Sequence, residues 1–111
     1  MNIPPHSHTI SLEGAFRDLE SKNFKTRLAA ADALSDMHDV HTRTRAVQAL
    51  IKSLDDNHPA VSAQAATSLG ALGMESAVEP LCKMLNHNIP FARQSAALAL
   101  GKLGFKSAFA A

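Results

Sequence analysis

The sequence repeats itself, and this repetition limits the possible folds more than any other feature of the chain. Residues 65–73 read Ala-Ala-Thr-Ser-Leu-Gly-Ala-Leu-Gly, and residues 96–104, 31 positions later, read Ala-Ala-Leu-Ala-Leu-Gly-Lys-Leu-Gly. The same offset relates Pro59 to Pro90. A fixed period of this length is typical of stacked repeats, in which each unit buries a face against its neighbours. The sequence therefore predicts a repeat protein whose default activity is binding.

The period continues upstream with an offset of 35 residues, which relates Leu34 to Leu69. Four extra residues thus lie between Leu34 and Ala46. Further upstream, residues 12–19 match residues 47–54, so the chain opens with the second half of a unit. We expect an all-α solenoid of about three two-helix units, of which the first and the last are incomplete.

Each complete unit is predicted to contain two helices. Apolar residues recur at intervals of three and four in the first helix of the middle unit, which indicates one buried stripe. Pro59 and Pro90 suit the first turn of a helix, and Gly73 and Gly104 suit a left-handed residue that ends one. We expect first helices over residues 23–37, 59–72 and 90–103, and second helices over about residues 44–54 and 76–85.

The second helix of each unit carries an apolar stripe of its own. The stripe of the middle unit recurs one unit later as four residues: Val78, Leu81, Cys82 and Leu85. In this alignment Cys82 takes the place of Ile51. We therefore expect Cys82 to be a small buried hydrophobic residue rather than a nucleophile.

The C-terminal residues predict an unfinished unit. Residues 106–109 match residues 75–78, so we expect a second helix to begin just after Gly104. The helix before it would then lack a complete partner for four apolar residues: Phe91, Leu98, Leu100 and Leu103. Because an exposed apolar patch favours association, we expect that the chain is a piece of a longer repeat protein or self-associates through its C-terminal end.

Composition narrows the possible environments. A net charge of +1 is too balanced to favour nucleic acid or an anionic membrane surface by bulk attraction. No apolar run reaches the length of a membrane span, and one cysteine cannot form an internal disulfide. We therefore expect a cytoplasmic protein, with a mobile leader over residues 1–10 and a single repeat domain over residues 11–111.

The repeated residues resemble a known family. The pattern Pro-x-Val-x-x-x-Ala-Ala-x-x-Leu-Gly-x-Leu-Gly, which begins at Pro59, resembles HEAT repeats and is most similar to the short class named after phycobilisome lyase subunits. The resemblance covers residues 12–109. It implies a right-handed solenoid in which the second helices line a concave side that often holds partners. Since the matching positions are those that pack, it favours a fold more than a specific function.

The resemblance also implies a structural polar contact. The family often places an arginine after the Val-like position of the first helix and an aspartate between repeats. Arg27 and Arg93 match the arginine, but Ser62 does not; Asp56 matches the aspartate, but His87 replaces it. We expect Arg93 to reach back to an acceptor of the Asp56 type.

The histidines offer a metal-binding hypothesis. His38 and His41 lie in the four-residue insertion, beside Asp36, where they would place two imidazoles and a carboxylate around a metal. The alternative is a solvated turn lengthened by polar residues, which we favour because His-x-x-His supplies too few ligands. We expect no metal and no other cofactor, and we expect His58 and His87 to cap helices or lie in loops.

Superposing the repeats aligns three cations on the second helices: Arg17, Lys52 and Lys83. Four residues before each cation stand Glu13, Gln48 and Glu79. One interpretation is that acids and cations pair at i, i+4 and support exposed helices. The other is a basic stripe that binds an acidic partner surface. Both interpretations stay open.

The functional prediction is a non-catalytic module that binds another protein of unknown identity through its stacked helices. No arrangement of residues in the sequence favours catalysis. The alternative, which rests on the family resemblance, is an accessory subunit of a bilin lyase or a phycobilisome-turnover factor that binds phycobiliproteins. Nucleic-acid binding is disfavoured because two of the three aligned cations have an acid one turn away.

Overall fold

The computed structural model describes residues 11–37 and 39–110 of the chain. The described residues form six α-helices and two short 3₁₀ segments. In chain order these elements are α1 (Leu12–Asp18), α2 (Phe24–Ala33), η1 (Leu34–Asp36), α3 (Val40–Ser53), α4 (Pro59–Leu72), η2 (Glu75–Ala77), α5 (Val78–Met84) and α6 (Pro90–Ala110).

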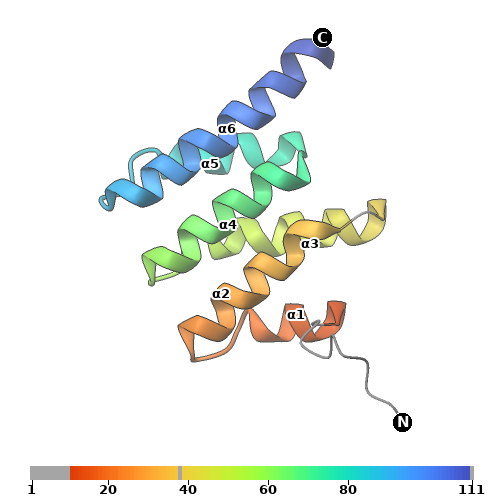
Figure 1. Cartoon of the computed structure of the whole chain (residues 1–111), viewed down its shortest axis with the longest axis vertical. Helices are drawn as coiled ribbons and strands as arrows, with labels where there is room; N and C mark the ends of the chain where they lie inside the picture. Colours follow the sequence, from red (N-terminus) through yellow and green to blue (C-terminus); the bar gives the residue numbers. More distant parts are fainter. Residues whose placement is uncertain (1–10, 38, 111) are drawn as a thin grey trace.

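The helices form two layers in an elongated stack of 49 × 32 × 19 Å (Figure 1). Helices α2, α4 and α6 lie side by side in one layer, and α1, α3 and α5 form the other (Figure 1). Helix α4 is central, because it packs against α2, α3 and α6. The prediction of an all-α solenoid of two-helix repeats is confirmed.

Local caps place the helix ends of the first layer. The side chain of Asn23 accepts a hydrogen bond from the N–H of Lys25 at the start of α2. At the start of α4, Nδ1 of His58 accepts the N–H of Ala60, and Pro59 occupies the first turn, where its missing N–H costs nothing. Gly73 ends α4 with φ 72°, a left-handed conformation that glycine adopts without strain. These predicted boundaries are confirmed.

The core is a continuous row of leucine and alanine between the two layers. Its largest fully buried side chains include Leu34, Leu50, Leu69, Leu81 and Leu103. Each leucine that is removed from water in this way contributes about 1.5–3 kcal/mol. The repeat offsets relate Leu34 to Leu69 and Leu50 to Leu81, and Leu103 is the counterpart of the buried Leu72, so each unit completes the core of its neighbour.

Helices α4 and α6 approach each other closely at Gly70. A Cβ atom added to Gly70 would lie 2.9 Å from the Cα of Ala99 and 3.0 Å from its Cβ. The absence of a side chain at Gly70 and the small side chain of Ala99 therefore set the distance between these two helices. Gly101, one repeat later, has no atom within 4 Å of the same position.

The four-residue insertion forms helix rather than a longer turn. Helix α3 begins at Val40, four residues before the predicted start. The carboxylate of Asp39 accepts the N–H and the hydroxyl of Thr42, at 3.0 and 3.1 Å, and this cap starts the helix early. The prediction of a turn was wrong because a capped segment adds helical hydrogen bonds to an existing helix at little cost.

The predicted helix end at Gly104 is also wrong. Helix α6 continues through Gly104 to Ala110, so residues 106–109 extend the first helix instead of beginning a second. Glycine permits either conformation, and the packing of the following residues decides between them. After Gly73 the chain turns back and buries Ala77 and Leu81 completely.

The apolar stripe of α5 differs from its prediction. Cys82 is exposed, and Leu85 is 39% exposed, whereas Met84 is buried. The buried positions of α5 are therefore Leu81 and Met84. Leu81 keeps the burial of its counterpart Leu50, whereas Cys82 and Leu85 lie on the last helix of this layer, and no further helix of the described residues packs over them. The repeated pattern thus predicts the orientation of the helix, but not which positions a following helix covers.

Candidate functional site

The turns between repeats share one hydrogen-bonding scheme. Ser21, Asp56 and His87 occupy the same position in three successive turns, and the side chain of each accepts the N–H of the residue two places ahead. The donor–acceptor distances are 3.1, 2.9 and 3.0 Å. The prediction that the two histidines cap helices or lie in loops is confirmed: His58 caps α4, and His87 accepts its hydrogen bond within the turn before α6.

A second scheme closes each turn from the helix that follows. Arg27, Ser62 and Arg93 occupy equivalent positions near the starts of α2, α4 and α6. Each donates to the backbone carbonyl six residues earlier, at 2.8, 3.0 and 2.7 Å. Two arginines and a serine therefore perform the same local task. The prediction that Arg93 would reach an acidic acceptor is wrong, because it binds the carbonyl of His87.

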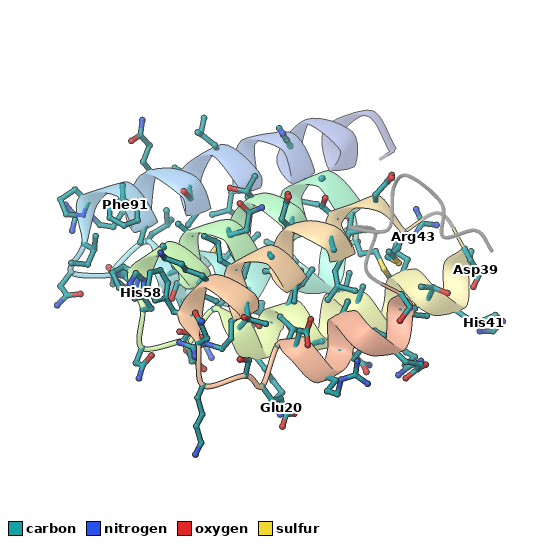
Figure 2. The ribbon with its side chains drawn as sticks, turned by 60° about the horizontal axis from the view of Figure 1, so that its bottom comes forward. Glu20, Asp39, His41, Arg43, His58 and Phe91 are labelled. Carbon is teal, nitrogen blue, oxygen red and sulfur yellow. The ribbon has the colours of Figure 1, made fainter. Side chains whose placement is uncertain are left out.

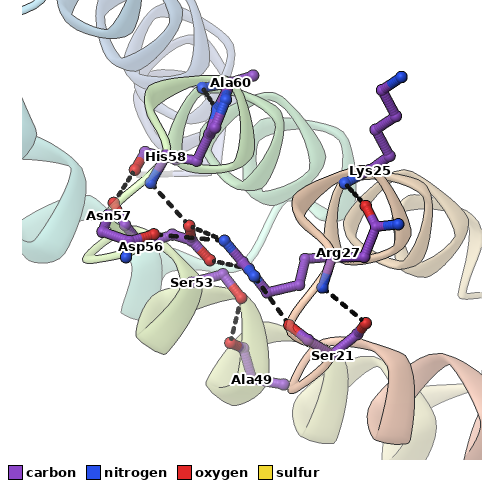
Figure 3. A network of polar contacts seen from close by, with 11 residues as sticks. Ser21, Lys25, Arg27, Ala49, Ser53, Asp56, Asn57, His58 and Ala60 are labelled. Atoms are coloured by element: carbon purple, nitrogen blue, oxygen red, sulfur yellow. Dashed lines mark hydrogen bonds and ion pairs between the residues drawn. The ribbon is translucent and has the colours of Figure 1, made fainter.

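Arg27 has an additional contact that crosses between repeats (Figure 3). Its Nε and Nη2 donate to the two carboxylate oxygens of Asp56 at 2.7 and 3.0 Å. The side chains are only 14% and 11% exposed. Burial acts to raise the pKa of Asp56, but the hydrogen bonds from Arg27 and from the N–H of His58 outweigh it and hold the pKa below its ordinary range.

An aromatic contact adjoins this ion pair. The rings of Phe24 and His58 are stacked, with their centroids 3.7 Å apart and their planes 6° from parallel. Asn57 accepts a weaker hydrogen bond from Arg27 at 3.3 Å. Together with Asp56, these residues join the start of α2 to the start of α4. This cluster has its polar groups paired within the protein, and it acts as a structural joint.

The predicted cation ladder lies on the layer of α1, α3 and α5. Arg17, Lys52 and Lys83 are each exposed, one on each helix. Within the described part of the chain, none of the three forms an ion pair. The predicted i, i+4 pairing is therefore not present, and the three ammonium or guanidinium groups face solvent.

Glu13 pairs instead with Arg45 of the neighbouring helix, which sequence reasoning missed. Nη1 of Arg45 donates to Oε2 of Glu13 at 3.1 Å, and the guanidinium lies 4.3 Å from the ring centroid of Phe16. The hydrogen bond and the charge of Arg45 lower the pKa of Glu13. Arg45 aligns with Ser76 in the next repeat. The lack of an arginine at this second position was the sequence signal that Arg45 has a role specific to its own repeat.

Two grooves run along the same layer. Groove A has a volume of about 520 Å³ and lies between α1 and α3, where Phe16, Ala49 and Lys52 line it. Groove B has a volume of about 340 Å³ and lies between α3 and α5, where Ile51 and Lys83 line it. Two of the three ladder cations thus border a groove, one for each.

Comparison with known families decides the class of protein. The family model described as HEAT repeats matches residues 47–111, which is more than half of the chain. The chain is a HEAT-repeat protein. A second model, described as PBS lyase HEAT-like repeat, matches residues 26–56. A comparison with curated proteins finds no match.

Of the two histidines in the metal-binding hypothesis, only His41 lies in the described part of this HEAT-repeat protein. His38 lies outside the described residues. His41 is exposed in the first turn of α3 and lies near Asp39, at the end of the helices opposite to His58 and Phe91 (Figure 2). Across residues 11–37 and 39–110, no three metal-ligating side chains gather in one place. In the same part of the chain, no helix combines the length and the apolar character of a membrane span.

The outer face of α6 is the exposed end of the HEAT stack. Phe91 is 49% exposed and Leu98 is 64% exposed, in agreement with the expected apolar patch. Leu103, which was also expected in that patch, is only 2% exposed, and Leu100 packs partly against the core. The helix rotation explains the difference, since these two residues face α4 and α5 rather than solvent.

Proposed function

We propose that this HEAT-repeat protein is a non-catalytic module that binds another protein through the layer of α1, α3 and α5. HEAT repeats generally mediate contacts between proteins. The observation that carries the proposal for this surface is the ladder of Arg17, Lys52 and Lys83. Its three cations occupy one register, are exposed, and have no ion-pair partner within the described residues.

The contrast with other charged residues supports this choice. Arg27 and Arg45 have carboxylate partners in the same chain, the first largely buried and the second at the surface, and Arg93 binds a backbone carbonyl. Those three side chains are already engaged in holding the fold. The ladder cations hold no carboxylate, so an acidic partner surface would gain contacts without breaking existing ones.

The experiment compares two triple charge reversals. In the ladder variant, Arg17, Lys52 and Lys83 are changed to Glu; in the matched control, the exposed residues Lys22, Lys25 and Lys102 are changed to Glu. Both change the net charge equally. Affinity capture from the native host, read by mass spectrometry, should lose its specific partner only with the ladder variant, while circular dichroism stays helical for both.

Retention of the partner by the ladder variant at low salt would contradict the proposed surface. Loss with both variants would mean that net charge, rather than the register of the ladder, governs capture.

The match of residues 26–56 to the PBS lyase HEAT-like repeat supports a second candidate function. In this function the protein is an accessory subunit of a bilin lyase or a phycobilisome-turnover factor. Mixing the protein with free bilin or with a phycobiliprotein should then give a shifted absorption band or zinc-enhanced fluorescence. An unchanged spectrum, with no co-elution on gel filtration, would contradict this candidate.

The exposed apolar face of α6 supports a second copy of this chain as a further binding partner. Phe91 and Leu98 would both leave water if a second copy covered this face. Light scattering should show a mass that rises with concentration, and Leu98→Glu should return the protein to a monomer. A monomer at all concentrations would contradict self-association.

A further inference from the structure

Grooves A and B are the same site, repeated. Eight of the nine positions that line groove A correspond, at the repeat offsets, to positions that line groove B. Phe16 corresponds to Ile51, and Lys52 corresponds to Lys83. The exception is Arg45, whose counterpart Ser76 does not line groove B. A surface that recurs in position presents two related sites to a ligand, one repeat apart, of which groove A is the larger.

Each groove has the same order of chemical groups. Apolar side chains line both grooves, namely Phe16 and Leu19 in groove A and Ile51 and Leu54 in groove B. In groove A the guanidinium of Arg45 lies over the Phe16 ring, 4.3 Å from its centroid, and leaves Leu19 and the edge of Phe16 for an apolar ligand. The later helix adds an exposed lysine to each rim, and an exposed carboxylate follows the earlier helix. These rim residues are Lys52 with Glu20 in groove A and Lys83 with Asp55 in groove B. One turn before the lysine, groove A has the neutral Gln48 and groove B has the carboxylate of Glu79.

This order defines the chemistry of a ligand. A partly buried apolar lining accepts an apolar side chain, which loses contact with water as it enters. The lysine beside it favours a carboxylate on the ligand. The acid at the other rim repels a ligand carboxylate, so a ligand binds in the orientation that places its carboxylate beside the lysine.

The spacing of the grooves defines the form of the ligand. Packed helices lie about 8–10 Å apart, so equivalent points on successive repeats are separated by roughly 10 Å. An α-helix rises 1.5 Å per residue, and residues seven apart lie on one face at about 10.5 Å. Two apolar side chains seven residues apart on a helix therefore match the two grooves.

We propose that grooves A and B together hold one amphipathic helix of a partner protein, whose two apolar side chains, seven residues apart, enter the two grooves and whose carboxylates face Lys52 and Lys83. This inference rests on the protein-binding function proposed above. It adds the secondary structure, the spacing and the charge pattern of the bound segment.

The test uses two synthetic helical peptides with a fluorescent label. The first carries Leu at two positions seven apart, with Glu four residues after each Leu, in an Ala/Gln host. The control has the same composition, but the second Leu–Glu pair is moved two residues along, which turns it to the opposite face of the helix. Fluorescence anisotropy should show about tenfold tighter binding of the first peptide, because only this peptide fills both grooves.

Protein variants then test the assignment of the lysines. Lys52→Glu and Lys83→Glu should each weaken binding of the first peptide by about fivefold, and the two changes together by more than tenfold. Lys25→Glu is the matched control, because Lys25 is exposed on α2 in the other layer, and it should leave the affinity unchanged. A peptide with Lys in place of both Glu residues should bind the double variant more tightly than it binds the original protein.

Equal affinity for the two peptides, absence of binding, or insensitivity to Lys52→Glu and Lys83→Glu would each overturn the inference. These outcomes are distinguishable from failure of the proposed function. If the triple ladder reversal still abolishes capture of the native partner while the two peptides bind equally, the interaction surface stands and only the two-groove helix fails.

Discussion

The two junctions between first-layer helices are built differently, although they occupy equivalent places in the repeat. The junction of α2 with α4 is polar: Arg27 binds Asp56, and the hydroxyl of Ser68 donates to the carbonyl of Ala31 at 2.8 Å. The junction of α4 with α6 is a close apolar contact, in which Gly70 lies against Ala99. Neighbouring helices of the first layer are thus joined by an ion pair at the first junction and by close packing against a glycine at the second.

The comparison shows which part of the repeat is obligatory. At the first junction, Arg27 both closes its own turn and binds Asp56. At the second junction, Ser62 closes the turn but is too short to span the repeat, and His87 caps without a charge partner. The turn contacts are therefore common to both junctions, whereas the cross-repeat ion pair is an addition that close packing replaces.

The largest expected effect is at the centre of the stack, which both junctions share. Leu69 on α4 is fully buried, and Leu69→Ala should lower the free energy of unfolding by about 2–5 kcal/mol through lost burial and a cavity. Lys52→Ala on the exposed ladder should change it by less than about 0.5 kcal/mol. Chemical denaturation followed by circular dichroism measures both. The reverse ranking would mean that the helix faces are wrongly assigned.

The next effect isolates the apolar junction with a matched pair of glycines. Gly70→Ala places a methyl group against the backbone of Ala99, so we expect a loss of about 1–3 kcal/mol despite the better helix propensity of alanine. Gly101→Ala enters open space on α6 and should stabilise the protein by about 0.5–1 kcal/mol. Thermal melts of the two variants should shift in opposite directions; shifts of the same sign would contradict the close approach.

The polar junction of α2 with α4 can be given the residues found at the equivalent positions of the junction of α4 with α6. Asp56→His should cost about 1–2 kcal/mol, because the largely buried Arg27 loses a charged hydrogen-bond partner. Adding Arg27→Ser reproduces the Ser62 and His87 pair and should recover part of this loss. Denaturant midpoints of the single and double variants give the coupling. Strictly additive losses would show that the two residues do not act together.

The smallest effect is a dependence on acid. The pKa of Asp56 is lower in the folded protein than its ordinary value of about 3.9. Its contribution to stability is therefore complete above that value and is lost as the pH falls through the folded pKa. Urea denaturation between neutral pH and about pH 3 should show Asp56→Asn losing less stability than the original protein. Asp55→Asn, in the exposed neighbouring position, is the control.

The periodicity predicted the helices and the turns well, but not which side chains a neighbouring helix covers. The caps at His58 and Gly73 were predictable because each depends on a few consecutive residues. The burial of Cys82 was wrongly predicted because its counterpart Ile51 is partly covered by the next helix of the layer, whereas no described helix follows α5 in that layer. The ladder residues were found by alignment, whereas Arg45 was missed because its partners, Glu13 and Phe16, come from the preceding repeat.

By itself the sequence determined the repeat, the two-helix unit and the capping turns, because these follow from patterns of fewer than forty residues and from local hydrogen bonds. The tertiary structure decided the rest. It determined that Arg27, rather than Arg93, forms an ion pair with an aspartate, and that Gly70 lies against Ala99. It also determined that α6 continues beyond Gly104 and that grooves A and B form between the helices of the second layer. Each of these depends on the distance and rotation between helices, which side-chain volumes fix only when the units are stacked together.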